Sequence, residues 1–256
     1  MWFLHIIDYI LICLIDNSMI SVCLASYNGE KYIKDQLLSI LPQLEKDDEI
    51  VISDDGSTDE TEMVVSSIGD KRIHFTKNLG NHGYTDNFEN ALSKAVGDII
   101  ILSDQDDIWC EDKVKTIVHD LEQYDYVVSD AKVVDQDLNI INESYWSLRT
   151  PHYSKWGNLV KCGFLGCCMA FRREVLKVAL PFPRNHKLIA HDNWLMLVGS
   201  FYFNVKYEKK PLMLYRRHGK NVSDGGFSHG VSFVMKIAYR SYIFYNLLIR
   251  YGRKAR

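Results

Sequence analysis

The sequence predicts an α/β fold in which a mainly parallel central sheet is flanked by helices. From Ile20 onward, short apolar runs alternate with segments whose apolar residues recur at helical spacing. The chain has 256 residues, of which 47% are hydrophobic and 25% charged, as in ordinary globular domains. Such alternation is typical of parallel sheets that are covered by helices on both faces.

The first four strands and helices are expected to follow one another in pairs. Each predicted strand is an apolar run that ends in turn residues, and each predicted helix repeats apolar side chains every three or four positions. The second helix opens with Ser57 and Glu60 at the spacing of a capping box. The expected strands are residues 20–26, 49–56, 72–78 and 98–104, and the expected helices are residues 31–41, 57–68, 85–96 and 111–123.

The second half of the chain is less regular. GCCMAFRRE (residues 166–174) predicts a short strand that enters a helix. AHDNWLMLVGSF (residues 190–201) predicts an almost wholly apolar helix with Asp192 near its start. KPLMLY (residues 210–215) predicts another strand.

The two ends differ from the middle. Residues 1–18 are apolar but carry Asp8 and Asp16, lack a basic start and a cleavage site, and are shorter than the ~20 residues of a spanning helix. We expect a non-essential extension, with a membrane-surface helix as the alternative. Residues 19–225 are expected to form the folded domain. Residues 226–256 form a basic amphipathic tail, which suits either packing on the domain or lying on an anionic membrane.

Charge and cysteine content narrow the function classes. The net charge of −3 gives no general positive field for nucleic acid. The six cysteines form no CxxC pair and several lie in apolar runs, which favours buried thiols in a reducing compartment over disulfides or zinc ligands. We therefore expect a cytoplasmic protein that does not bind nucleic acid.

Polar clusters follow three of the predicted strands. SYNGE follows the first strand, SDDGSTD the second and SDQDD the fourth. Ligands of open α/β sheets bind at the carboxyl ends of the strands. Taken alone, DDGS is also typical of an Asx turn that leads into a helix. Together the clusters predict a binding site that contains Tyr27, Asp54, Asp55, Asp104 and Asp106.

The carboxylates of DQDD indicate a cation. Asp104, Asp106 and Asp107 repel one another unless water or a cation screens them; a solvated loop is the weaker interpretation, and a hard, oxygen-preferring ion such as Mg²⁺ or Mn²⁺ suits these carboxylates. Such an ion would also hold substrate phosphates. The sequence contains neither G-x-G-x-x-G nor G-x-x-x-x-G-K-[ST], so dinucleotide and Walker-type phosphate loops have no support.

Five motifs occur in order along residues 20–224: SVCLASYNGEKYIKDQLLSIL, ISDDGSTDET, DIIILSDQDDIW, HDNWL and YRRHGKN. In this order and spacing they resemble family 2 of the glycosyltransferases. The resemblance implies the GT-A fold, a Rossmann-like architecture for nucleotide-diphospho-sugar transfer, and an inverting reaction. The DQDDIW and YRRHGKN forms are most similar to rhamnosyltransferase-like enzymes of bacterial O-antigen, capsule and cell-wall polysaccharide synthesis.

The resemblance also implies roles for individual residues. It matches Asp192 to the catalytic base, although a helix start also suits an N-cap. Many relatives have Glu-Asp where this chain has His191-Asp192, which leaves the partner of the base open. It matches Asp106 to the direct ligand of Mn²⁺ or Mg²⁺. A loop histidine is often only solvated, but beside Arg216 and Arg217 the His218 side chain can meet a diphosphate or join Asp106 as a metal ligand. It assigns nucleotide-sugar binding to Ala25, Tyr27, Asp54, Asp55, Asp104, Asp106 and Arg217.

The implied function is sugar transfer from a UDP- or dTDP-sugar to a hydroxyl of a saccharide or lipid-linked acceptor. The implied location is the cytoplasm, with peripheral contact to the inner face of the cell membrane through the tail. Two other classes stay open. A haloacid-dehalogenase-like, Mg²⁺-dependent phosphatase also has aspartates after an apolar strand, but its motif continues D-x-D-x-[TV] and the fifth residue here is Ile108. A non-catalytic nucleotide-sugar-binding module would keep the strand-end residues and lack the base.

Overall fold

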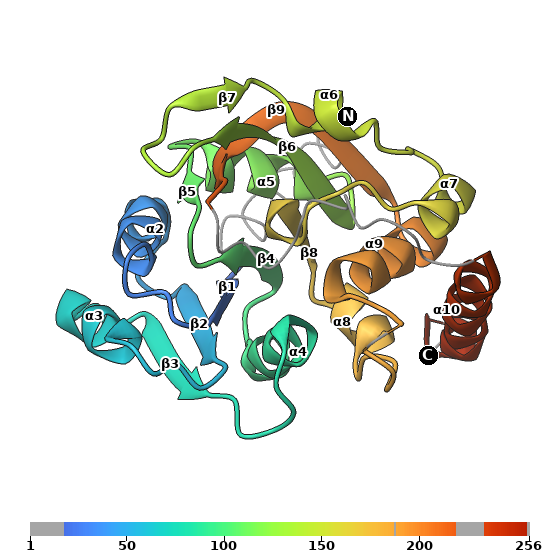
Figure 1. Cartoon of the computed structure of the whole chain (residues 1–256), viewed down its shortest axis with the longest axis horizontal. Coiled ribbons are helices and arrows are strands. Elements are labelled where there is room, and N and C mark those ends of the chain that lie inside the picture. Colours follow the sequence, from blue (N-terminus) through green and yellow to red (C-terminus); the bar gives the residue numbers. More distant parts are fainter. Residues whose placement is uncertain (1–17, 187, 219–232, 255–256) are drawn as a thin grey trace, which may run out of the picture.

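The centre of the fold is a mixed nine-stranded sheet with helices on both faces (Figure 1). The computed structural model describes residues 18–186, 188–218 and 233–254. The strand order is β3-β2-β1-β4-β8-β6-β9-β5, and β7 pairs with β6 outside this path. The strands are β1 (Ile20–Ser26), β2 (Glu49–Asp54), β3 (Ile73–Lys77), β4 (Ile99–Asp104), β5 (Ile108–Trp109), β6 (Tyr126–Val134), β7 (Ile140–Asn142), β8 (Met169–Arg172) and β9 (Val205–Arg216).

The predicted α/β class is confirmed, and the sheet consists of two halves. The first half, β3-β2-β1-β4, is parallel throughout, as expected from the alternating strands and helices. In the second half β8 runs antiparallel between β4 and β6, whereas β6 and β9 are parallel. The sheet is therefore mixed beyond β4, because the segments before β8 and β9 are not simple helical crossovers.

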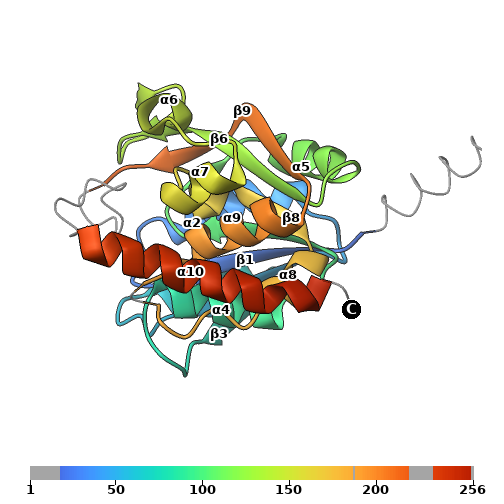
Figure 2. The same ribbon diagram turned by 90° about the vertical axis from the view of Figure 1, so that its right-hand side faces the viewer.

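The helices form two layers (Figure 1). α2 and α3 lie on one face, and α4 packs on β1 and β2 from the other face, beside α9. α10 packs on α8 and α9 at the outside of this second layer (Figure 2). The helices are α2 (Ile33–Ile40), α3 (Thr61–Ile68), α4 (Tyr84–Lys94), α5 (Lys113–Leu121), α6 (Tyr145–Arg149), α7 (Lys155–Val160), α8 (Glu174–Ala179), α9 (His191–Tyr202) and α10 (Phe233–Lys254), with 3-10 turns η1 (Leu41–Gln43) and η2 (Gly166–Cys168).

The parallel strands form the core because helices cover both of their faces. Side chains that point to opposite faces, such as Val22, Cys23 and Leu24, are all fully buried. A strand that is buried on both sides reads as a continuous apolar run, and this is the pattern of the predicted strands. The five described cysteines are free, and Cys23, Cys167 and Cys168 are buried, as predicted for thiols in apolar runs.

The predicted capping box at Ser57 is wrong. α3 begins at Thr61, and no side chain caps the helix. The Ser57 hydroxyl instead donates to Asp54 Oδ2 (2.5 Å), so it belongs to the loop after β2. The capping box does not form because the Ser57 oxygen accepts from the Asn28 N–H (2.8 Å) while its proton goes to Asp54, so the serine is held in the loop.

The second half agrees with the elements predicted there. β8 leads into α8, α9 begins at His191, and β9 contains KPLMLY. The predicted extension falls almost wholly on residues 1–17, which lie outside the described residues. Among the described helices, none is both long and apolar enough to cross a bilayer.

Candidate active site

The carboxyl ends of three neighbouring parallel strands bring the residues of separate motifs to one edge of the sheet, here called the rim. In the ladder between β1 and β2, Ser26 lies opposite Asp54. In the ladder between β1 and β4, Ala25 lies opposite Asp104. Tyr27 follows directly and is about half exposed. The sheet topology thus collects at the rim the polar clusters that the sequence placed after the strands.

Side-chain hydrogen bonds join the loops of the rim. The Gln105 side chain accepts from the Tyr27 N–H and donates to the Tyr27 carbonyl, both at 2.9 Å. Asn28 has a positive φ of 48°, and its N–H donates to Ser57 Oγ (2.8 Å). The loop after β1 is therefore held to the loops after β4 and β2, and the Tyr27 side chain remains accessible between them.

The two aspartates of DDGS have different surroundings. Asp54 is 2% exposed, and its carboxylate accepts from Ser26 Oγ (2.9 Å) and from the Ser57 N–H (2.8 Å). It also accepts from the Gly56 N–H, so Asp54 makes the Asx-type turn that was the alternative interpretation of DDGS. Asp55 is partly exposed and faces the loop between β3 and α4.

That loop was missed from the sequence, although it completes this corner of the rim. Asn78 Nδ2 donates to Asp55 Oδ1 (2.9 Å), and the Gly83 N–H donates to Asp55 Oδ2 (2.7 Å). His82 Nδ1 lies 3.2 Å from Asp55 Oδ1. The available signal was NLGNHG between the third strand and third helix, since Gly and Asn are typical of loops with unusual backbone angles, and Gly83 has a φ of 121°.

Asp104, Asp106 and Asp107 form a compact acidic group at the end of β4. Burial and the Asp106 carboxylate raise the pKa of Asp104 to about 7. Burial raises the pKa of Asp107 well above its usual value. Asp107 is fully buried and accepts a hydrogen bond from the Arg216 N–H (3.0 Å). Asp107 therefore faces the interior, whereas the Asp106 carboxylate remains partly accessible.

His218 comes from a distant part of the chain to meet Asp106. Its Nε2 lies 2.7 Å from Asp106 Oδ2, and the two side chains are 10% and 16% exposed. The His218 ring stacks on Tyr32, with centroids 4.9 Å apart. The two residues predicted as metal ligands thus converge on one point of the rim.

The adjacent arginines lie in different environments. Arg216 is 4% exposed; its Nε donates to the Asp106 carbonyl (2.9 Å), and its guanidinium lies 4.7 Å from the centroid of Tyr32. Arg217, which was predicted to bind the nucleotide sugar, is partly exposed, and its N–H donates to the Val134 carbonyl (2.8 Å). Arg216 therefore holds the backbone of the acidic loop from a buried position, and Arg217 is the more accessible of the two cations.

The donor atoms at Asp106 and His218 fit a divalent cation. A carboxylate oxygen and an imidazole nitrogen that lie 2.7 Å apart can both bind Mn²⁺ or Mg²⁺, and the raised pKa of Asp104 reflects a carboxylate crowding that a cation would relieve. A second group has ligand atoms within 4.8 Å of one another, in Asp104, Asp107 and Cys167. That group is less suitable, because two members are buried and a thiol is a poor ligand for hard cations.

Asp192 lies in the first turn of α9. The N-cap of this helix is Ala190 and has no side-chain cap, so the N-cap interpretation of Asp192 is wrong. Asp192 Oδ1 accepts from the N–H of the next residue, Asn193 (2.6 Å). The Asp192 charge also contributes to the raised pKa of Asp104, so the two carboxylates belong to one electrostatic neighbourhood.

His191, the residue before Asp192, is a packed side chain. It is 8% exposed, its ring stacks on Phe88 with centroids 4.1 Å apart, and burial lowers its pKa. Gly166 allows η2 to approach it, since a Cβ there would lie 2.6 Å from His191 Nε2. His191 therefore positions the start of α9 by packing against Phe88 and η2.

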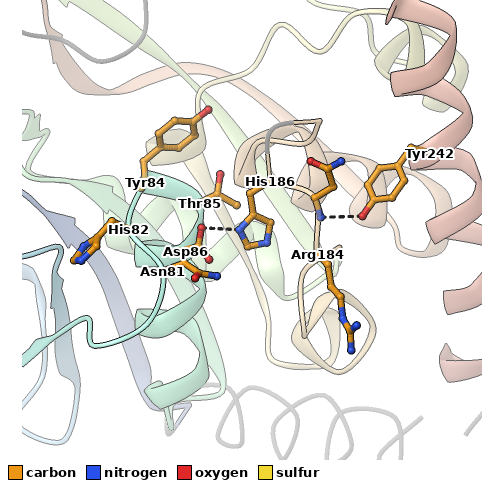
Figure 3. Close-up of a pocket in the computed structure, with 10 residues that line it drawn as sticks. Asn81, His82, Tyr84, Thr85, Asp86, Arg184, His186 and Tyr242 are labelled. Carbon is orange, nitrogen blue, oxygen red and sulfur yellow. Dashed lines mark hydrogen bonds and ion pairs between the residues drawn. The ribbon is translucent and has the colours of Figure 1, made fainter.

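A cavity of about 520 Å³ opens beside the start of α4 (Figure 3). His186 Nδ1 lies 2.6 Å from Asp86 Oδ2, and Tyr242 Oη accepts from the Asn185 N–H (3.0 Å). Tyr84 connects the cavity to α9: its ring is 5.7 Å from that of His191, and burial and Asp192 raise its pKa. The lining residues are Asn81, His82, Gly83, Tyr84, Thr85, Asp86, Arg184, Asn185, His186 and Tyr242.

Known proteins resemble this chain in sequence. The family model described as Glycosyl transferase family 2 matches residues 21–180. WfaP of Escherichia coli, a UDP-Glc:alpha-D-GlcNAc-diphosphoundecaprenol beta-1,3-glucosyltransferase, is 36% identical over 82% of this chain and 81% of its own length. RfbG of Shigella flexneri, a dTDP-rhamnosyl transferase, is 28% identical over 77% of this chain and 72% of its own length. An uncharacterized glycosyltransferase of Nostoc sp. is 28% identical over 79% of this chain and 66% of its own length.

Solved structures share the fold. TarS of S. aureus in complex with UDP-GlcNAc superposes with a TM-score of 0.65 at 19% identity, covering 91% of this chain and 72% of that one. Glucosyl-3-phosphoglycerate synthase of Mycobacterium tuberculosis, solved with Mn²⁺, UDP and glucosyl-3-phosphoglycerate, gives a TM-score of 0.56 at 20% identity, covering 94% of this chain and 83% of that one. Both are similar in the α/β domain described above.

Proposed function

This chain belongs to family 2 of the glycosyltransferases, and on that premise we propose that it transfers a sugar from a nucleotide-diphosphate sugar to an acceptor hydroxyl in bacterial surface polysaccharide synthesis. One observation supports the proposal: Asp55 and the Asp106–His218 pair come from separate elements and lie at one rim, and the charge of Asp192 acts on Asp104 beside them. A non-catalytic module would have no need for an accessible carboxylate beside the acidic group.

The donor binds across the carboxyl ends of β1, β2 and β4 in this proposal. Tyr27 and Asp55 contact the nucleobase, with the backbone at Ala25 below them, and Asp104 lies near the ribose. Asp54 shapes the loop, since its side chain is 2% exposed and bonded within its own turn. Arg217 faces the diphosphate. Relatives are named for a UDP-sugar and a dTDP-sugar, so the donor carries one of these two bases.

Asp106 and His218 hold Mn²⁺ or Mg²⁺ in this proposal. When bound, the cation supplies charge that offsets the negative charge growing on the nucleoside diphosphate as it leaves. Tyr32 and Arg216 keep the two ligands in place, because the ring of Tyr32 stacks on His218 and Arg216 holds the Asp106 backbone. A solved structure that shares the fold contains Mn²⁺ and UDP.

Asp192 is the base of a single displacement. It takes the proton of the acceptor hydroxyl while the hydroxyl oxygen forms a bond to the anomeric carbon. The bond from that carbon to the phosphate oxygen breaks at the same time, and the electron pair leaves with the nucleoside diphosphate. Attack from the face opposite the leaving group inverts the anomeric configuration.

The acceptor occupies the cavity beside α4. Tyr84 and Tyr242 offer ring faces to a sugar, and the polar side chains around them offer partners for its hydroxyls. WfaP is named for a diphosphoundecaprenol-linked acceptor, which makes a lipid-linked saccharide the acceptor we favour over a free one. The enzyme would then work at the cytoplasmic face of a membrane, with the C-terminal segment in peripheral contact.

The test of the base is Asp192→Asn, which keeps the size of the side chain and removes its basic oxygen. We expect transfer to fall by about 10²–10⁴-fold, the range for loss of a general base, while nucleoside diphosphate binds as before. Asp47→Asn, an exposed aspartate before β2, is the matched control and should leave transfer unchanged. Transfer is measured with UDP- and dTDP-sugars, and binding is measured by titration calorimetry.

Three results would overturn the proposal. Near-normal transfer by Asp192→Asn removes the base. A product that retains the donor's anomeric configuration by NMR removes the single displacement. Metal-dependent hydrolysis of phosphate esters, with no transfer from any nucleotide sugar, would instead identify the phosphatase alternative.

A further inference from the structure

α10 has one face packed against the domain and another face open. Ile243, Leu247 and Arg250 are at most 5% exposed and lie against the body of the protein. Figure 2 views the open face, where α10 lies outermost and crosses the surface formed by α8 and α9. The helix thus covers the domain with one stripe of residues and presents the rest outward.

Between Ile237 and Gly252, the part of α10 whose side chains the structure describes after Lys236, no exposed side chain is charged. Tyr245 and Tyr251 are 62% and 71% exposed, and Leu248 and Ile249 are 59% and 51% exposed. A helix that only covers a domain carries polar and charged residues on its outer face. The exposed residues between positions 237 and 252 are Ile237, Ala238, Ser241, Phe244, Tyr245, Leu248, Ile249, Tyr251 and Gly252.

The apolar surface continues from α10 onto α7. Trp156 and Val160 are 56% and 59% exposed, and the Trp156 ring lies 6.3 Å from that of Phe244. Arg240 Nη2 donates to the Val160 carbonyl (2.8 Å), which fixes the two helices together. A contiguous apolar patch made from two helices marks a binding surface far more strongly than scattered apolar residues do.

Positive charge borders this patch. α10 contains five Lys or Arg and no Asp or Glu, and α7 also lacks acidic residues. Lys155, Lys161 and Lys236 are exposed at its edges. Apolar and aromatic residues surrounded by Lys and Arg suit the interface of an anionic bilayer. A second copy of the chain suits the patch less, because pairing two such faces would bring their positive borders together.

α10 is held firmly enough to present this face without rearranging. Arg250 donates to the carbonyls of Val178 (3.1 Å) and Leu180 (3.0 Å), and its guanidinium lies 5.5 Å from the centroid of Trp194. The Tyr202 hydroxyl donates to the Leu247 carbonyl. The outer face is therefore preorganised, which lowers the entropic cost of binding a surface.

We propose that the outer face of α10 and the adjoining edge of α7 form a docking surface for an anionic lipid bilayer, on which α10 lies in the plane of the interface. Tyr242 lies on the flank of α10 and lines the cavity beside α4, so a bilayer on this face would border that cavity. The inference rests on the proposed function in one respect only, namely that the acceptor is located in the bilayer.

The test uses the full chain and vesicles of phosphatidylcholine, with or without an equal amount of phosphatidylglycerol. Wild-type protein should sediment with the anionic vesicles and less with the neutral ones. Leu248→Glu/Ile249→Glu should lower the affinity for anionic vesicles by roughly 10²-fold or more, because two apolar side chains lose their burial in lipid and two repelled charges are gained. Both positions are exposed, so the fold should persist, as circular dichroism would show.

The matched control is Met63→Glu/Val96→Glu. These residues are 59% and 63% exposed and lie on α3 and after α4, away from the docking surface. The control makes the same change in charge and should bind vesicles as the wild type does. Equal vesicle binding by the wild type, the control and the α10 variant would overturn the proposal, as would equal losses in both variants.

Sedimentation without vesicles tests whether a second copy of the chain, rather than a bilayer, covers this face. A wild-type dimer that Leu248→Glu/Ile249→Glu converts to a monomer, together with no binding to either vesicle, would assign the face to a second copy and reject the bilayer. Transfer to a water-soluble acceptor should be unchanged in the α10 variant. Loss of this transfer would show that the α10 surface is also needed for catalysis. Vesicle binding tests the docking surface separately from transfer.

Discussion

At the scale of single residues, the site depends on polar groups that are far apart in the chain. Asp106 and His218 are separated by 112 positions, and their facing atoms lie 2.7 Å apart. Asp55 has partners on the loop between β3 and α4, and Asp54 has partners on its own turn. Neighbouring aspartates therefore have different surroundings, because Asp54 is buried in its own turn and Asp55 is partly exposed beside the loop before α4.

The metal assignment leads to a residue-scale prediction. Asp106→Ala should abolish the rise in melting temperature that Mn²⁺ or Mg²⁺ gives together with nucleoside diphosphate, since one of two proposed ligands is gone. Transfer should fall by roughly 10³-fold, as expected when the charge stabilisation of a metal worth several kcal/mol is lost. Thermal denaturation with and without chelator measures the first effect.

Asp137→Ala is the control for that variant, because Asp137 is exposed between β6 and β7. Its metal-dependent shift should equal that of the wild type. The same shift in Asp106→Ala, or full transfer in excess chelator, would exclude Asp106 as a metal ligand.

At the scale of elements, two helices are set in place by contacts at their ends. Gly166 lets η2 pack against the first turn of α9, which carries Asp192. Arg250 ties α10 to the end of α8 by donating to the carbonyls of its last two residues and of the two residues that follow. In both cases the contact decides where a helix face points, and α10 can present an apolar outer face because its inner face is anchored.

Arg250→Met tests the anchoring of α10. The variant keeps much of the apolar stem and removes the donors, which leaves buried carbonyls without these partners. We expect a loss of about 2 kcal/mol in the free energy of unfolding and a melting temperature lower by roughly 4–8 °C. Lys236→Met, at an exposed position of the same helix, should change neither quantity measurably. An unchanged melting temperature in Arg250→Met would show that apolar packing alone holds the helix.

At the scale of the whole molecule, the two halves of the sheet contribute different residues to the candidate site. The parallel half contributes the rim of β1, β2 and β4, where the donor is proposed to bind. The mixed half contributes β9, whose end leads to Arg217 and His218, and α9 with Asp192. The active site therefore lies where the halves meet, and neither half holds the proposed donor site, metal ligands and base together.

Deletion of residues 1–17 is the whole-molecule prediction. The sheet begins at Ile20, and the Met19 carbonyl extends the pairing of β1 with β4 by accepting from the N–H groups of Asp98 (2.6 Å) and Ile99 (3.1 Å). We expect the shortened chain to keep the melting temperature and the transfer rate of the full chain, because the described core does not require the deleted residues. Both are measured side by side, with vesicle sedimentation as a third readout. Reduced vesicle binding alone would support the membrane-surface alternative for these residues, and a large loss of stability would contradict a non-essential extension.

The sequence by itself determined the α/β class, the first four strands and helices, and the strand ends at which polar residues gather. These follow from local physics: apolar periodicity selects strand or helix, and turn residues end each run. The family resemblance added roles: the base for Asp192, and the direct metal ligand for Asp106, which the strand-end clusters had already assigned to the site. No pattern in the sequence told Asp54 from Asp55, because their difference lies in bonds to Ser26 and to the loop of Gly83.

Only the tertiary structure decided which distant groups meet. It placed Arg216 beneath the acidic loop, brought Asn78 to Asp55, and made the second half of the sheet mixed. It also decided how α10 is used. The amphipathic pattern of the tail fitted both packing and membrane contact, and the structure packs Ile243 and Leu247 inward while Leu248 and Ile249 remain exposed. Periodicity specifies that a helix has an apolar face, but the shape and charge of the surface beneath it determine which face is covered.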